Sequence, residues 1–130
     1  YPLGPEGVRT YMMTVNAHFL AELLPGCPVI HPLQDPVPRV AVVDACRFCA
    51  GDESAADRLP HTWQVTSDSI ALRIAKVWRA SRLILLKSCE KSPNSNWCDS
   101  AKEELVDAMF PVLAEKFAGS IEWVNFRRLS

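Results

Sequence analysis

The chain has 130 residues and a net charge of −1, with 48% hydrophobic and 22% charged residues. This composition is typical of one soluble globular domain over residues 1–130. The near-zero charge does not favour nucleic acid or an anionic membrane as a partner, and no apolar run approaches the roughly 20 residues that span a bilayer.

Stretches of helical and strand-like periodicity alternate along the chain. The predicted elements are, in order, a helix over 8–24, strands over 28–31 and 39–44, a helix from 67, a strand over 83–86, a helix from 100 and a strand over 121–126. Such alternation predicts an α/β fold, with helices packed on a mostly parallel sheet.

Proline, glycine and polar residues predict the segments between these elements. Residues 34–38 form a proline-rich turn, and the polar stretch 49–62 is predicted as a loop. Ser100 and Glu103 have the spacing of a capping box and would start a helix, which Pro111 would end or kink.

Five cysteines and the lack of a secretory signal pattern favour free thiols in a reducing, cytoplasmic compartment. Cys46 and Cys49 form a C-x-x-C motif. Zinc would need a second ligand pair, and no second C-x-x-C or paired histidine exists. A redox role remains open because the motif follows the strand-like residues 40–43. Structural thiols are the simpler interpretation.

Thr66, Ser67 and Asp68 stand where a helix is predicted to begin. Thr66 or Ser67 can cap the helix, and Asp68 falls in its first turn. Hydroxyls, a carboxylate and free amides at one helix start suit the binding of a phosphate group, or of a lysine or metal that binds one. The alternative is a plain N-cap without a ligand.

In parallel α/β folds, ligands collect at the carboxyl ends of the strands. Asp44, Lys87 and Ser88 follow predicted strands, and the helix start at residues 66–68 faces the same edge. The alternative interpretation of Lys87 is that it contacts no ligand and simply reaches solvent from the end of the strand. Asp107 is predicted as a surface charge on a helix.

The same residues resemble a known family. The segment Leu59-Pro60-His61-Thr62-Trp63-Gln64-Val65-Thr66-Ser67-Asp68-Ser69-Ile70-Ala71, followed by residues 83–88, resembles the amino acid kinase superfamily of aspartate, glutamate and uridylate kinases. The closest branch is the small kinases that act on aminomethyl-furan-methyl phosphate in methanofuran biosynthesis. Residues 105–111 and 122–127 agree with that branch, so the resemblance covers most of the chain. Residues 59–71 carry its specific part.

The resemblance implies an αβα sandwich and ATP- and Mg²⁺-dependent phosphoryl transfer to a carboxylate or phosphate acceptor. It places Asp68 as the catalytic residue that orients lysines, Thr66 and Ser67 near the acceptor, and Lys87 and Ser88 near the nucleotide. Transfer of this kind depends on positioning and charge neutralisation. Family members commonly self-associate, so the resemblance also implies a homo-oligomer.

The chain also departs from the family pattern. It has neither the Lys-x-Gly-Gly strand nor the second glycine-rich loop, its first lysine is Lys76, and Pro111-Val112 stands where many members have Pro-Lys. Because the glycine-rich N-terminal part of the family pattern is not present in this chain, we expect residues 1–130 to correspond to the central and C-terminal part of such a kinase fold. The alternatives are a non-catalytic nucleotide- or phosphate-binding module and a thiol or zinc protein that uses Cys46 and Cys49.

Overall fold

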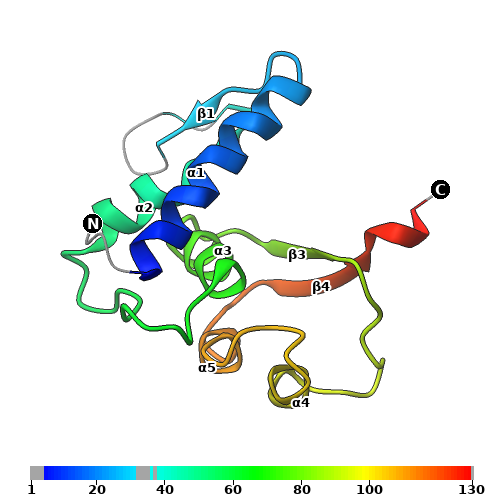
Figure 1. The fold of residues 1–130 in the computed structure, drawn as a ribbon. Coiled ribbons are helices and arrows are strands. Elements are labelled where there is room, and N and C mark those ends of the chain that lie inside the picture. Colours follow the sequence, from blue (N-terminus) through cyan, green and yellow to red (C-terminus); the bar gives the residue numbers. More distant parts are fainter. Residues whose placement is uncertain (1–4, 32–35, 37, 130) are drawn as a thin grey trace. The chain divides into compact units, whose positions relative to one another are not determined.

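The structure is a computed structural model that describes residues 5–31, 36 and 38–129. The chain divides into two compact units, residues 1–61 and residues 62–130. The described residues form helices and two parallel sheets of two strands each, so the prediction of a mixed α/β structure is confirmed (Figure 1). The finer predictions, an αβα sandwich and a single domain over 1–130, stay predictions.

The first unit is built from a long helix, two short strands and a second helix. These are α1 (Pro5–Leu23), β1 (Val29–Ile30), β2 (Val42–Val43) and α2 (Ala45–Asp52). The strands pair in parallel, with Val29 opposite Val42 and Ile30 opposite Val43. The helix predicted over 8–24 is confirmed, whereas both strands are shorter than predicted. Most of the turn predicted over 34–38 lies outside the described residues.

Helix α2 was missed, because the segment from Cys49 onward was predicted as a loop. Asp44 starts this helix: its Oδ1 accepts a hydrogen bond from the Arg47 amide at 3.1 Å and one from Thr14 Oγ1 at 2.7 Å. Asp44 is only 2% exposed, so this carboxylate joins α1 to the start of α2 inside the unit. A buried cap outweighed the weak helical propensity of Gly51.

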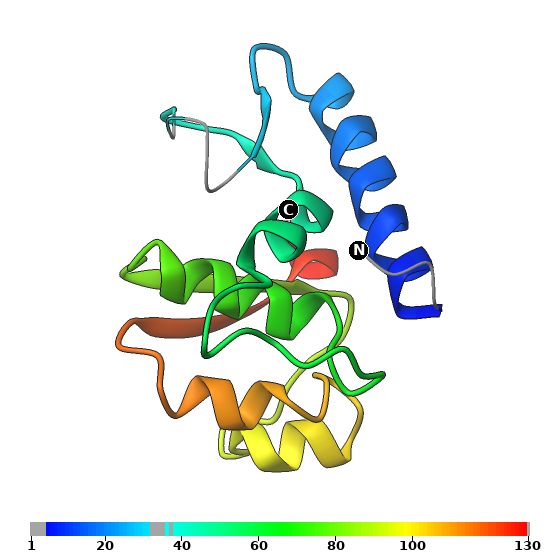
Figure 2. The same ribbon diagram turned by 90° about the vertical axis from the view of Figure 1, so that its left-hand side faces the viewer.

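The second unit contains the remaining elements. They are α3 (Ser67–Val77), β3 (Arg82–Lys87), α4 (Trp97–Lys102), α5 (Phe110–Ala114), β4 (Ser120–Asn125) and the 3₁₀ turn η1 (Phe126–Arg128). Strands β3 and β4 run parallel, from Arg82 opposite Ser120 to Lys87 opposite Asn125. Parallel neighbours require a crossover connection, which α4 and α5 provide (Figure 2).

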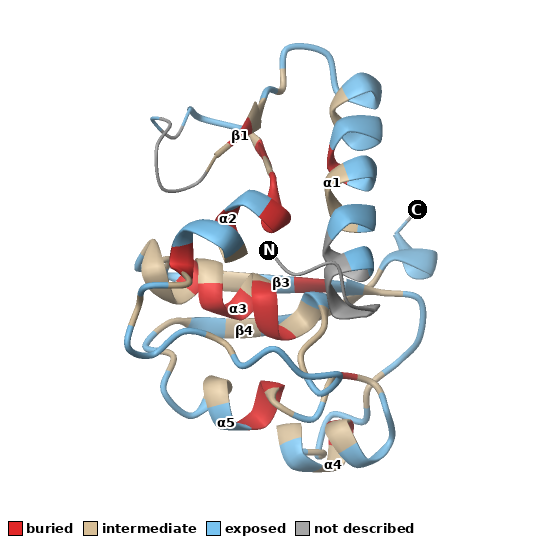
Figure 3. Ribbon diagram, turned by 60° about the vertical axis from the view of Figure 1, so that its left-hand side comes forward, coloured by how far each residue is buried: buried red, intermediate tan, exposed pale blue. Residues whose placement is uncertain are grey.

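A small apolar core holds this unit together. Leu72 of α3, Leu85 of β3, Phe110 of α5, and Val106 from the connection before α5 are all at most 5% exposed and pack together. Figure 3 shows buried positions on α3 and α5. Leu85 lies on the core side of β3. Side chains alternate along a strand, so Ile84 and Leu86 point to the other side, where both are exposed.

The capping box predicted at Ser100 is wrong. Asn96 caps α4 instead, because its Oδ1 accepts from the Asp99 amide at 2.9 Å. Ser100 is fully buried inside the helix, and its hydroxyl donates to the Asn96 carbonyl at 3.1 Å. Glu104 then takes a left-handed conformation with φ of 57°, which ends α4 soon after residue 102.

Pro111 was predicted to end or kink a helix, and it lies instead in the first turn of α5. A proline there costs no hydrogen bond, because the first amides of a helix have no partner within the helix. Residues 103–109 are consequently an irregular connection between two short helices rather than one continuous helix.

Gly119 lies in a tight passage before β4, and we predict that Gly119→Ala destabilises the second unit. An added Cβ would lie 2.7 Å from the Ser81 carbonyl oxygen and 2.8 Å from that of Ala80, and backbone atoms cannot easily give way. We expect the free energy of unfolding to fall by about 2 kcal/mol. The neighbouring exposed change Ser120→Ala should stay within about 0.5 kcal/mol.

All four tryptophans lie within residues 62–130, so tryptophan fluorescence during urea denaturation follows this unit. Equal midpoints for Gly119→Ala and Ser120→Ala would contradict the close approach at Gly119.

Candidate functional site

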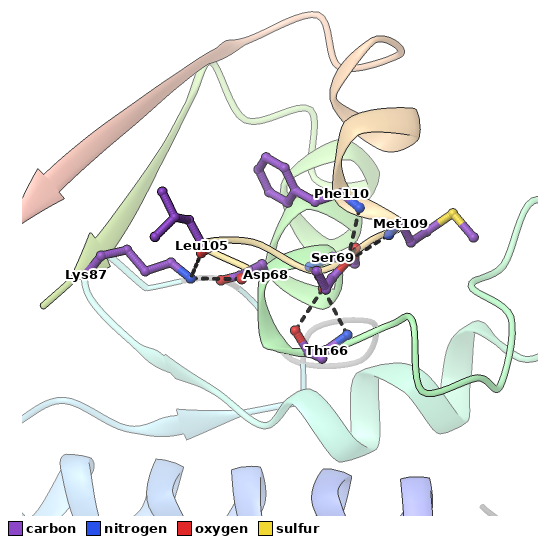
Figure 4. Close-up of polar contacts among 8 residues, drawn as sticks. Thr66, Asp68, Ser69, Lys87, Leu105, Met109 and Phe110 are labelled. Atoms are coloured by element: carbon purple, nitrogen blue, oxygen red, sulfur yellow. Dashed lines mark hydrogen bonds and ion pairs between the residues drawn. The ribbon is translucent and has the colours of Figure 1, made fainter. Parts of the chain in front are cut away.

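The carboxylate of Asp107 accepts six hydrogen bonds in the second unit. Its Oδ2 accepts hydrogen bonds from the Thr66 amide at 2.9 Å, from Thr66 Oγ1 at 2.8 Å and from the Ser69 amide at 3.0 Å. Its Oδ1 accepts from Ser69 Oγ and from the amides of Met109 and Phe110 at 3.1 and 3.0 Å. One side chain therefore fixes the starts of both α3 and α5. Figure 4 labels its partners Thr66, Ser69, Met109 and Phe110.

This arrangement corrects two predictions. Thr66 occupies the N-cap position of α3, but its side chain makes no capping hydrogen bond and donates to Asp107 instead. Asp107 is not a helix surface charge, because it lies outside any helix and its carboxylate is engaged on both oxygens. An anion of the protein itself thus already occupies the positive end of α3.

Asp68 and Lys87, predicted from separate elements, do meet. Lys87 Nζ lies 2.8 Å from Asp68 Oδ2 and 2.9 Å from the carbonyl oxygen of Leu105 (Figure 4). The Lys87 side chain is 22% exposed and that of Asp68 is 13% exposed, so the pair is shielded but reachable. The lysine nitrogen also lies 5.7 Å from the centre of the Trp123 ring, within the range of a cation–π contact.

Each partner keeps unused bonding capacity. Lys87 has three N–H donors, of which two are engaged by described residues. Asp68 Oδ1 has no hydrogen-bond partner within the described part of the chain. The pair can therefore bind a further acceptor through nitrogen and a further donor or cation through oxygen.

Two hydroxyls flank the pair in sequence. Ser67 precedes Asp68 and Ser88 follows Lys87, and both residues are exposed. Neither hydroxyl makes a hydrogen bond to a described residue. Of the other predicted residues, Thr66 is committed to Asp107, and Asp44 is the buried cap of α2 in the first unit.

A further polar group at the ends of β3 and β4 was not predicted. Glu90 accepts from Asn125 Nδ2 at 2.9 Å and pairs with Arg128 Nε at 2.7 Å. The Trp123 indole N–H donates to the Cys89 carbonyl at 3.0 Å. No sequence pattern pointed to this group, because it depends on the observed register of β3 and β4, which places Asn125 opposite Lys87.

The C-x-x-C motif lies in the first turns of α2, directly after β2, as the redox interpretation requires. Its chemistry is unfavourable, however. Burial raises the pKa of the Cys49 thiol to about 12, with smaller contributions from Cys46, Asp52 and Glu53. A thiol with such a pKa is a poor nucleophile and a poor metal ligand near neutral pH.

All five cysteines are described and carry free thiols. Within 5–31, 36 and 38–129, no three His, Cys, Asp or Glu side chains are grouped to hold a metal ion.

No protein family model, curated protein or solved structure matches the chain. The amino acid kinase resemblance accordingly stays a prediction based on the residues quoted for it. Among the described helices, none has the length and apolar character to cross a bilayer.

We predict that Asp107→Ala strongly destabilises the second unit. It would leave the amides of Thr66 and Ser69 and those at the start of α5 without their acceptor, at a cost of about 3 kcal/mol. Asp107→Asn keeps one acceptor oxygen, so its free energy of unfolding should fall less than that of Asp107→Ala. The half-exposed acid Asp99 is the control, because Asp99→Ala should cost at most about 0.5 kcal/mol.

Tryptophan fluorescence during urea denaturation measures all three variants. If Asp107→Ala and Asp99→Ala had equal urea midpoints, water would replace the Asp107 carboxylate without loss of stability, which would contradict the prediction.

The raised pKa of Cys49 gives a pH-dependent prediction. Below pH 12 this thiol is mostly neutral, so at pH 8 its thiolate fraction is about a thousandfold lower than for an ordinary thiol of pKa 9.0. Labelling with an aromatic disulfide, mapped by peptide mass spectrometry, should modify exposed Cys89 and Cys98 first. Cys49 should react only at much higher pH or after urea unfolding. Equal rates for the three thiols would contradict the burial of Cys49.

Proposed function

We propose that the chain is the nucleotide-side part of an ATP-dependent small-molecule kinase, which transfers a phosphoryl group to a carboxylate or phosphate acceptor. The observation that carries the proposal is the ion pair between Asp68 and Lys87, where α3 begins and β3 ends. The amino acid kinase resemblance implies a role for each of these residues, and here their charged groups lie 2.8 Å apart.

The free groups of the pair suit MgATP. The remaining N–H of Lys87 can donate to a phosphate oxygen, and Asp68 Oδ1 is a hard oxygen ligand of the kind that Mg²⁺ takes. Mg²⁺ at nucleotide sites commonly uses one or two carboxylates together with phosphate oxygens and water, so a single protein carboxylate suffices. When bound, MgATP supplies the phosphoryl group and part of the charge neutralisation.

The chain's own residues have three tasks in this proposal. Asp68 holds the Lys87 ammonium in one place, and the Leu105 carbonyl limits its rotation. Lys87 offers a fixed positive charge to the oxygens of the phosphoryl group, which preorganises the site. The exposed hydroxyl of Ser67 beside Asp68 can donate to the acceptor, and that of Ser88 can donate to the nucleotide.

A non-catalytic module that binds a nucleotide or phosphate is the second candidate. One observation favours it: Asp107 occupies the amides of Thr66 and Ser69, so these donors are not available to a transferred phosphate. In this alternative Lys87 binds phosphate without any transfer. The two candidates share the binding step and differ in turnover.

Calorimetric titration with MgATP tests the shared step. We expect Asp68→Asn and Lys87→Gln each to weaken MgATP binding at least tenfold, since a charge-assisted contact contributes more than about 1.4 kcal/mol. Asp99→Asn is the matched control: Asp99 is a half-exposed acid on α4 beside Lys102, and this variant should bind as the unchanged chain does. Tryptophan fluorescence confirms that each variant is folded.

Unchanged affinity in both Asp68→Asn and Lys87→Gln would place the nucleotide away from this pair. Absence of binding by the unchanged chain at millimolar MgATP would reject both candidates for these residues. If MgATP binds, a turnover assay separates the two candidates. The kinase should transfer phosphate to a carboxylate or phosphate acceptor and lose this activity in Asp68→Asn, whereas the binding module should show no transfer.

A further inference from the structure

Helix α1 has its large apolar side chains on the outside. Six of them lie on one side of the helix, and each is 48% to 66% exposed. We call this set the α1 seam; it consists of Val8, Tyr11, Met12, Val15, Phe19 and Leu23. In Figure 3, most of the α1 ribbon that is not grey has the colour of exposed residues. An amphipathic helix normally turns such a stripe toward a core.

The opposite side of α1 holds the helix in its unit through small residues. Ala17 is 7% exposed, and Ala21 is half-buried. Thr14 donates its hydroxyl to the buried Asp44. Helix α1 is thus anchored by its small side, and the seam is not needed to hold it to β2 and α2.

The seam has the spacing of a helix–helix contact. Val8, Met12, Val15 and Phe19 follow one another at intervals of four, three and four residues, which is the alternation of a coiled-coil contact line. Because α1 has 19 residues, it is about 28 Å long, and the seam runs along most of that length. A second helix of similar length would fit it.

We propose that the α1 seam binds the α1 seam of a second copy of this chain and forms a reversible homodimer. Among the described helices, the next longest is α3 with 11 residues, and its apolar residues Ile70 and Leu72 are already buried. A two-fold dimer brings the same patch of both copies together, so each supplies the long apolar helix that the other lacks. The six seam residues carry no charge, and the exposed Glu22 lies on the same side of α1 near its C-terminal end.

The area agrees with a weak, specific dimer. Six large apolar side chains, each offering roughly 150 Å² and exposing about half of it, contribute on the order of 500 Å² per copy. The total of about 1,000 Å² lies at the lower end of the range for biological interfaces. We therefore expect a dissociation constant in the micromolar range. The seam contains no residue of the Asp68–Lys87 pair, so the dimer and the kinase proposal can fail independently.

Sedimentation velocity from about 1 to 200 µM tests the dimer. The unchanged chain should shift from monomer to dimer across this range. Val15→Glu and Phe19→Glu should each weaken association at least tenfold, because a charge would enter the apolar contact. Leu20→Glu is the matched control: Leu20 is exposed on the same helix but lies roughly 100° round from Phe19, so its association should change less than about threefold.

Hydrogen exchange on the unchanged chain gives a second readout that needs no variant. Amides of α1 should become better protected at high protein concentration, whereas those of α3 should not. A monomer at every concentration would overturn the proposal, and so would equal weakening by Phe19→Glu and Leu20→Glu. Concentration-dependent protection confined to α3 or β3 would also overturn it, because the interface would then lie elsewhere.

Discussion

The second unit depends on one carboxylate. Asp107 lies in an irregular connection, yet it accepts from the first turn of α3 and from the start of α5 at once. Unpaired amides at two helix starts would each cost free energy, and a single partly buried anion accepts from both starts. Since α3 carries Leu72 and α5 carries Phe110, this polar contact also sets how the apolar core closes.

The same constraint shapes the candidate site. Because Asp107 neutralises the start of α3, Asp68 in that first turn is free to pair with Lys87 instead of capping the helix. The two anions thus have different partners. Asp107 accepts hydrogen bonds from backbone amides, and Asp68 pairs with the Lys87 ammonium nearer the surface. A ligand at this edge would meet a shielded lysine and a carboxylate oxygen, whereas the amides of Thr66 and Ser69, which a phosphate could otherwise bind, already donate to Asp107.

The sequence predicted α1, α3, β3 and β4 because each has a periodic apolar pattern, and it predicted that Asp68 and Lys87 belong to one site. It did not predict the partner of Thr66, since Asp107 lies 41 residues away and capping rules describe only local hydrogen bonds. Pro111 was interpreted as the end or kink of a helix, although prolines also begin helices. The predicted helix therefore ran from residue 100 to Pro111 and wrongly included Asp107. Helix α2 was missed because its cap, Asp44, is stabilised by Thr14 from a distant element.

The long reach of Asp107 has a consequence for synthesis. The chain emerges from the ribosome starting at its N-terminus, and domains usually fold in that order. Helix α3 is made early, but its N-terminal amides obtain their acceptor only after residue 107 has left the exit tunnel. Strand β3 likewise waits for β4, its parallel neighbour. We therefore expect a nascent second unit to stay unfolded until nearly all of it has emerged.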